Sequence, residues 1–159
     1  MNILLICVGT LKEAYWRDAA DEYRKRLGRY CTLTIDEVKE ARAPARPSPA
    51  EAHAAKDAEG AAILRRVKSE SHVIALDVRG AALSSEAFAE KLAALPHAGA
   101  GHVTFITGGP LGLAEAVLAR ADLRLSLSAM TLPHRLARVV LLEQLYRAFT
   151  ILRGEGYHR

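Results

Sequence analysis

Apolar residues follow two different spacings along this chain, and the two spacings alternate from one end to the other. Short runs that are continuously apolar, or alternate with polar residues, predict five strands at residues 2–8, 32–38, 72–78, 102–107 and 123–127. Apolar residues three or four positions apart predict helices at 12–28, 49–70, 84–93, 113–119 and 133–153. This alternation is typical of an α/β fold with a mostly parallel sheet and helices on both faces.

Local signals mark some of the boundaries between these elements. The segment Ser48-Pro49-Ala50-Glu51 has the pattern of a capping box with proline at the first helical position. It ends a proline-rich loop at 41–49, and another turn is expected at Pro96–Gly101. We find no internal repeat and no linker in the sequence, which therefore predicts a single domain over residues 1–159.

The composition, with 50% hydrophobic and 25% charged residues, is that of an ordinary globular protein. A chain of 159 residues can bury a core without disulfides or a structural metal. Cys7 and Cys31 fit no metal-ligand spacing, so we expect buried free thiols in a reducing compartment. The apolar N-terminal run lacks a basic leader, and no stretch is long enough to span a bilayer. These features predict a cytoplasmic protein with no membrane association.

The charge is modestly basic and unevenly placed. The formal net charge of +4 is compatible with nucleic-acid binding but does not establish it. Between residues 130 and 159, five arginines stand against two glutamates, and no lysine is present. Arginine suits the recognition of phosphate or carboxylate, but a solvated helix face explains the same pattern equally well.

Three segments are expected at the carboxyl ends of strands, where open parallel sheets bind ligands. They are residues 76–80, 107–112 and 127–132. Gly108 and Gly109 would let the backbone approach a ligand closely, although most such glycine pairs only form a tight turn. The third segment carries no charged side chain, so it would bind through backbone groups and apolar contact. That chemistry favours an adenine or thioether-like ligand over a triphosphate.

The signatures of several common enzyme classes are missing from the sequence. It has no GxxxxGK[ST] phosphate loop and no GxGxxG after the first strand, which argues against the usual nucleotide-binding proteins. It has no GxSxG elbow, no HExxH and no metal-ligand spacing among its six histidines. We therefore expect neither a hydrolase nor a metal site.

The last helix and the tail after it carry unusual side chains. One stripe of the helix is apolar and consists of Leu141, Leu145, Ala148, Phe149 and Leu152. Three further apolar residues, Val139, Val140 and Tyr146, lie beside this stripe. Such a helix favours a partner subunit, with burial inside one chain as the alternative. His134 is more simply a helix-start residue than a ligand-facing one. Tyr157, His158 and Arg159 follow two glycines, so this tail either folds back over a site or hangs loose.

Several motifs, in this order and at these spacings, carry a family resemblance over essentially the whole chain. They are Val8-Gly9-Thr10, Leu76-Asp77, Gly108-Gly109-Pro110, Leu125-Ser126-Leu127-Ser128, Met130-Thr131-Leu132-Pro133-His134, Glu143-Gln144-Leu145-Tyr146-Arg147-Ala148 and Tyr157-His158. With these motifs the chain resembles the ribosomal RNA large-subunit methyltransferase H family of the SPOUT superfamily. It departs from the family pattern at Arg135, where glutamine is common, and in the proline-rich loop.

The resemblance implies a homodimer that methylates N3 of a pseudouridine in 23S rRNA on the assembled ribosome, with S-adenosylmethionine as the cofactor. It also implies a C-terminal trefoil knot formed by the Gly108 loop, the 127–132 segment and the last helix. The residues implied to bind the cofactor are Leu76, Gly108, Leu127, Ser128, Ala129, Met130, Thr131 and Leu132.

The nucleophile implied by the resemblance is an imide nitrogen, which must lose its proton before it attacks the methyl group. A positioned base can take that proton, and a nearby cation can stabilise the anion. His158 is the candidate base, and Arg159 or Arg153 is the candidate cation. Tyr157 would pack on the target base, and solvent is the alternative proton acceptor.

Other functions remain open from the sequence. A related methyltransferase could act on tRNA, and a ribosome assembly factor could keep the fold without catalysis. A small anion- or nucleotide-binding protein would need a phosphate-binding lysine or serine in the glycine loop, which has neither. Arg17, Arg24 and Arg135 are candidate phosphate contacts, with plain surface charge as the alternative.

Overall fold

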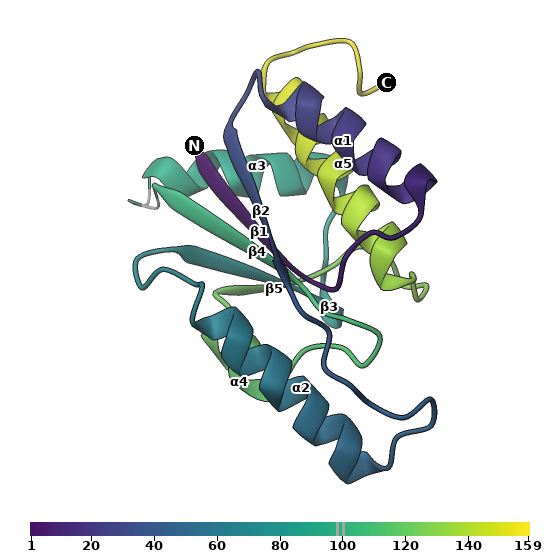
Figure 1. Ribbon diagram of the computed structural model, residues 1–159. Helices are drawn as coiled ribbons and strands as arrows, with labels where there is room; N and C mark the ends of the chain where they lie inside the picture. The colour runs from purple at the N-terminus through teal and green to yellow at the C-terminus, as the bar shows by residue number, and fades with distance from the viewer. Residues whose placement is uncertain (98, 100) are drawn as a thin grey trace.

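The computed structural model describes residues 1–97, 99 and 101–159. Within these residues, five strands form a parallel sheet in the order β2-β1-β4-β3-β5. They are β1 (Asn2–Val8), β2 (Thr32–Val38), β3 (His72–Ala82), β4 (His102–Thr107) and β5 (Leu123–Ser126). The parallel sheet expected from the sequence is therefore confirmed (Figure 1).

Helices cover both faces of this sheet and make three layers. They are α1 (Ala14–Leu27), α2 (Pro49–Leu64), α3 (Ser85–His97), α4 (Glu115–Arg120) and α5 (His134–Leu152). Helices α1, α3 and α5 lie on one face, and α2 and α4 lie on the other (Figure 1). This is the arrangement of helices that the alternating pattern predicts.

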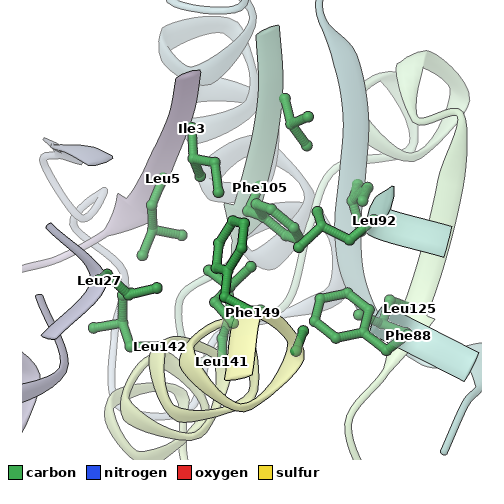
Figure 2. Packing of buried hydrophobic residues seen from close by; sticks show 14 of the residues in the cluster. Ile3, Leu5, Leu27, Phe88, Leu92, Phe105, Leu125, Leu141, Leu142 and Phe149 are labelled. Atoms are coloured by element: carbon green, nitrogen blue, oxygen red, sulfur yellow. The ribbon is translucent and has the colours of Figure 1, made fainter. Parts of the chain in front are cut away.

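The side chains of β1 show why a central strand is apolar throughout. Ile3 and Leu5 belong to the core under α1, α3 and α5, whereas Ile6 and Val8 belong to the core under α2 and α4. Successive side chains of a strand point to opposite faces, and both faces are covered here. In the larger core, Phe105 of β4 lies close to the α5 residues and to Phe88 of α3 (Figure 2).

Helix α2 begins as the sequence predicts but ends earlier. The Ser48 side chain accepts a hydrogen bond from the Glu51 N–H, and the Glu51 carboxylate accepts one from the Ser48 N–H, so the capping box is confirmed. The helix ends at Leu64, well before the expected end near residue 70. Val67 still packs against the core beneath α2, and this contact extends the apolar pattern past the helix.

Helix α3, in contrast, ends later than the sequence predicts. It continues past Ala93 and includes Pro96, which lacks a backbone N–H and cannot donate to the carbonyl four residues earlier; the helix ends one residue later. Leu95 in this last turn packs against the larger core. The turn expected at Pro96–Gly101 therefore begins inside the helix, and residues 98 and 100 of it lie outside the described residues. The other helix ends lie within about two residues of the expected positions.

Cys7 and Cys31 are both free thiols, Cys7 fully buried and Cys31 partly so. Burial raises the pKa of both, and that of Cys31 reaches about 11. No helix in the described part of the chain is both long enough and apolar enough to cross a membrane.

Candidate functional site

A cavity of about 440 Å³ lies at the carboxyl edge of the sheet. Its walls come mainly from three segments that are far apart in the sequence, around residues 76–79, 107–113 and 125–137. Helix α2 adds Lys56, and α4 adds Leu118. The three segments that the sequence predicts at strand ends therefore meet at one site, and the volume suits a small organic ligand.

The first wall is an irregular part of β3, so the prediction that this strand ends at residue 78 is wrong, and the segment 76–80 lies inside the strand. Strand β3 continues to Ala82, and its pairing with β5 shifts register between Leu76 and Ala81. The extra residues form a bulge, which a strand uses to redirect side chains. Gly80 brings the chain back against β5, where a Cβ would lie 2.6 Å from the carbonyl of Arg124. The bulge places Leu76 and Asp77 in the cavity wall.

The second wall is the glycine loop after β4, which closes on itself. The Gly112 N–H donates to the Gly109 carbonyl at 3.1 Å, and the two residues form an isolated antiparallel bridge. A Cβ at Gly108 would lie 2.9 Å from the carbonyl carbon of Gly112, which itself has φ of +81°. The turn itself therefore requires glycine at these positions. Gly108, Gly109 and Gly112 all line the cavity.

The third wall is the segment between β5 and α5, which is shaped by its own hydrogen bonds. The Ser126 hydroxyl donates to the Ser128 carbonyl at 3.0 Å, and the Ser128 hydroxyl accepts from the Met130 N–H at 2.9 Å. Four of the expected cofactor residues from this segment line the cavity: Leu127, Ser128, Met130 and Leu132. Ala129 and Thr131 are exposed beside it. The cofactor roles of these six residues, and those of Leu76 and Gly108, stay predictions.

Few charged groups stand among these apolar and backbone groups. Lys56, Asp77, Arg79 and Glu115 line the cavity together with His134. Burial, followed by the charge of Arg135, holds the pKa of His134 below its usual value, so the neutral imidazole is favoured. His134 begins α5 and also faces the cavity, so the helix-start interpretation describes only part of its position.

Sequence reasoning did not single out Lys56 or Asp77 as site residues. Nothing in the sequence around Lys56 indicates its place, because that place depends on how α2 crosses the sheet edge. Asp77 did carry a signal, since it directly follows Leu76 in one of the family motifs. No cluster of three or more acidic, histidine or cysteine side chains that could hold a metal ion occurs among residues 1–97, 99 and 101–159.

The C-terminal tail is ordered against α5 and α3 of its own chain. The Tyr157 hydroxyl donates to Glu143 at 3.0 Å, and the Arg147 guanidinium lies 4.7 Å from the centre of the Tyr157 ring. His158 Nε2 lies 2.8 Å from Glu86 at the start of α3. The tail is therefore not loose in this chain, but it does not fold over the cavity either.

The four candidate catalytic residues lie apart from the cavity. Arg153 covers the ring of Tyr30 at 4.6 Å, and the Arg159 Nε donates to the Gly156 carbonyl at 3.2 Å. Neither these arginines nor Tyr157 or His158 belong to the cavity wall. Within one chain, the structure thus groups most of the candidate cofactor residues but does not bring the candidate catalytic residues to them.

The candidate phosphate contacts divide into two groups. Arg17 and Arg24 of α1 line a second cavity of about 520 Å³, which also includes Arg138. Arg138 is buried there and donates to Glu37 at 2.6 Å and to the Gly9 carbonyl at 2.7 Å. Arg135 instead pairs with Glu13 at 2.8 Å. Of these arginines, Arg17 and Arg24 are exposed.

Comparison with known proteins gives the class to which this fold belongs. A family model described as "Predicted SPOUT methyltransferase" matches residues 1–158. The fold is similar to that of a probable methylase family protein from Haemophilus influenzae, with a TM-score of 0.53 and 16% identity over 99% of this chain and 70% of that one. A putative methylase family protein from Neisseria gonorrhoeae gives a TM-score of 0.54 and 15% identity over 91% and 81%. The class is that of the SPOUT methyltransferases.

Relatives with much higher identity narrow this class. A protein from Listeria monocytogenes is 51% identical, and one from Alkaliphilus oremlandii is 50% identical, each over all of both chains. Both bear the name "Ribosomal RNA large subunit methyltransferase H". The chain therefore belongs to the ribosomal RNA large subunit methyltransferase H family of SPOUT methyltransferases.

Proposed function

We propose that this protein methylates N3 of a pseudouridine in the 23S rRNA of assembled ribosomes, in the cytoplasm, with S-adenosylmethionine as the methyl donor. One observation supports the proposal most directly: three strand-end segments meet at a single cavity of about 440 Å³, lined by leucines, glycines and backbone groups. Membership of a family whose relatives are named for rRNA methylation supports the choice of substrate. The whole chain would act as a single SPOUT methyltransferase domain.

The residues at the cavity suit the proposed cofactor. Leucines provide apolar contact for a flat base, and the backbone groups of the uncharged 127–132 segment provide donors and acceptors. The residues that would hold the cofactor are Leu76, Gly108, Leu127, Ser128, Ala129, Met130, Thr131 and Leu132. When bound, S-adenosylmethionine supplies an electrophilic methyl group and leaves as an uncharged thioether. The protein holds the reacting atoms in line, which accounts for much of the rate in such transfers.

The tail residues would handle the proton of the target imide. His158 would accept the N3 proton, and Arg159 or Arg153 would stabilise the resulting anion. Tyr157 would pack on the target base. Because these residues lie outside the cavity wall of their own chain, the mechanism requires either a rearranged tail or a tail from a second copy. Solvent is the other acceptor for the proton.

A second copy of the chain fits the exposed surface of α5. Leu141, Leu145 and Ala148 are buried against the sheet, whereas Val139, Val140 and Tyr146 are only half-buried and Leu152 is exposed. Apolar groups left half-exposed along one helix favour an interface between subunits. We include a homodimer in the proposal, and the trefoil knot formed by the Gly108 loop, the 127–132 segment and α5 stays a prediction.

Methyl transfer from labelled S-adenosylmethionine tests the function. The substrates are ribosomes, isolated large subunits and bulk tRNA, each from cells that lack this protein. We expect label in 23S rRNA of ribosomes, mapped to N3 of a pseudouridine. Label in tRNA alone would assign the protein to a different RNA, and no label despite cofactor binding would favour an assembly role. Full methylation by His158→Ala would exclude His158 as the base.

A further inference from the structure

Asp77 is unusual in the cavity wall because part of its carboxylate is buried without a partner. Its side chain is only 8% exposed. Its Oδ2 atom has no solvent contact and no hydrogen-bond partner among the described residues. Burial of a polar atom without a partner costs free energy, because the lost water contacts are not replaced. Each such atom in a folded protein calls for an explanation, and a ligand is one of the physical possibilities.

The other carboxylate oxygen fixes the position of the side chain. Asp77 Oδ1 accepts a hydrogen bond from the Arg79 backbone N–H at 3.1 Å. The Arg79 guanidinium is also near this oxygen, at 3.4 Å, but it is mostly exposed and lies 3.9 Å from Glu115 as well. The carboxylate is thus held by the backbone through one oxygen, and the second oxygen has no donor.

Two further buried atoms lack partners in the described part of the chain, but their situation differs. They are Glu13 Oε2 and Arg135 Nε, whose side chains form a 2.8 Å ion pair with each other and do not line the main cavity. Asp77 Oδ2 belongs to a side chain that lines the main cavity. A ligand in that cavity lies beside this side chain and can supply the missing donor once the surrounding segment moves enough to uncover Oδ2.

The local backbone allows the ligand to meet this oxygen. Residues 77–80 lie in the bulge of β3 and are not paired with β5. A small adjustment of this unpaired stretch would expose Oδ2 to the cavity without breaking the strand pairing on either side. Lys56 and Arg79 are the cationic side chains that line the same cavity, and the ion pairs of Arg79 with Asp77 Oδ1 and Glu115 leave Oδ2 unused.

We propose that Asp77 is a cofactor-binding residue, and that its Oδ2 accepts a hydrogen bond from a ribose hydroxyl or from the α-ammonium group of bound S-adenosylmethionine. The inference rests on the proposed function, since it takes that cofactor as the ligand of the cavity. Both groups offer the O–H or N–H donor that the carboxylate lacks. The uncharged 127–132 segment then remains for the adenine ring.

Calorimetric binding with ligand analogues tests this role. Asp77→Asn keeps the size of the side chain and the acceptor for the Arg79 N–H, and Asp18→Asn, at an exposed site on α1, is the matched control. We expect Asp77→Asn to bind S-adenosylhomocysteine roughly 10- to 100-fold more weakly than wild type. The melting temperature of ligand-free Asp77→Asn should be close to that of wild type, because the side-chain acceptor for the Arg79 N–H is kept. Asp18→Asn should change neither quantity.

Methylthioadenosine, which keeps the ribose but lacks the amino acid part, separates the two donors. Weaker binding of both analogues by Asp77→Asn supports the ribose hydroxyl, and weaker binding of S-adenosylhomocysteine alone supports the ammonium group. Equal binding by wild type and variant would overturn the proposal, as would a lower melting temperature that accounts for the loss. If Asp77→Asn does not fold, Asp77→Ser allows the same comparison. A wild-type protein that binds none of these ligands would instead contradict the proposed function.

Discussion

The Tyr157 hydroxyl donates a hydrogen bond of 3.0 Å to Oε1 of Glu143 and so joins the C-terminal tail to α5. The same oxygen accepts from the Arg147 guanidinium at 2.6 Å. The Tyr157 ring also packs edge-on against Tyr146, with 4.7 Å between the ring centres. Burial and hydrogen bonds to neighbouring side chains hold the pKa of Tyr157 well above its usual value. The phenol therefore stays protonated and able to donate throughout the neutral pH range.

Replacing Tyr157 with phenylalanine should loosen the tail without unfolding the domain. The ring packing is kept, and only the hydrogen bond to a charged acceptor is lost. That bond contributes about 1–3 kcal/mol to holding the tail on the domain. We expect faster amide hydrogen exchange at residues 155–159 and a nearly unchanged melting temperature. Tyr15→Phe, at an exposed site on α1, is the control. Unchanged exchange in the tail of Tyr157→Phe would show that the hydroxyl does not hold it.

The lowered pKa of Glu86, at the start of α3, predicts a pH dependence of stability at acidic pH. The Glu86 pKa is lowered to about 2 by its own backbone N–H at the start of α3, by the Ser84 hydroxyl and by His158. A carboxyl whose pKa is lower in the folded state stabilises it above the ordinary pKa of 4.5, and this contribution is lost as pH falls toward 2. Denaturant unfolding between pH 2.5 and about 6 should therefore show a shallower decline for Glu86→Gln than for wild type.

Glu90→Gln is the matched control for this measurement, because Glu90 is exposed on the same helix. It should follow the wild-type profile. Parallel profiles for Glu86→Gln and wild type would contradict the prediction.

Much of the fold is predictable from the sequence, because the spacing of apolar residues typical of strands and the spacing typical of helices both have direct physical causes. Continuous apolar runs such as Asn2–Val8 occur because helices cover both faces of the sheet. The three cavity walls are predictable for a similar reason, since the carboxyl ends of parallel strands lie at one edge. The helix predicted at 49–70 is longer than α2, because Val67 keeps an apolar contact with the core after the helix has ended.

Other features depend on how distant parts of the chain meet, and the local pattern does not contain them. The bulge of β3 depends on the close approach of Gly80 to Arg124, a residue on another strand. The place of Lys56 in the cavity wall depends on the path of α2. The tail is held by Glu86 and Glu143, and nothing in the spacing of either residue indicates a contact with Tyr157 or His158.

The buried carboxylate of Glu59 allows a separate test of the packing behind the glycine loop. It is buried behind the glycine loop, accepts the Ala41 N–H at 2.9 Å, and its Oε2 lies 3.7 Å from the place of a Cβ on Gly109. Burial raises its pKa, so its contribution to stability falls as pH rises above the ordinary value of 4.5. Glu59→Gln keeps the acceptor and removes the charge, so its unfolding free energy at pH 7 should equal or exceed that of wild type.

Glu59→Leu is the contrasting variant, because it leaves the Ala41 N–H without an acceptor. Its unfolding free energy in urea should fall by about 1–3 kcal/mol. Equal losses in the glutamine and leucine variants would show that the negative charge itself is needed.

Gly60 allows a test of how closely α2 packs against the start of α4. A Cβ at this position would lie 2.8 Å from the Ala114 Cβ, so Gly60→Ala forces the two segments apart. The expected loss from overpacking, about 1–3 kcal/mol, exceeds or cancels the gain of about 1 kcal/mol from replacing a helical glycine. The double variant Gly60→Ala/Ala114→Gly removes the clash while keeping the better helix former. Denaturant unfolding should show the double variant to be more stable than the sum of the two single changes, and strict additivity would mean that the two positions do not restrict each other.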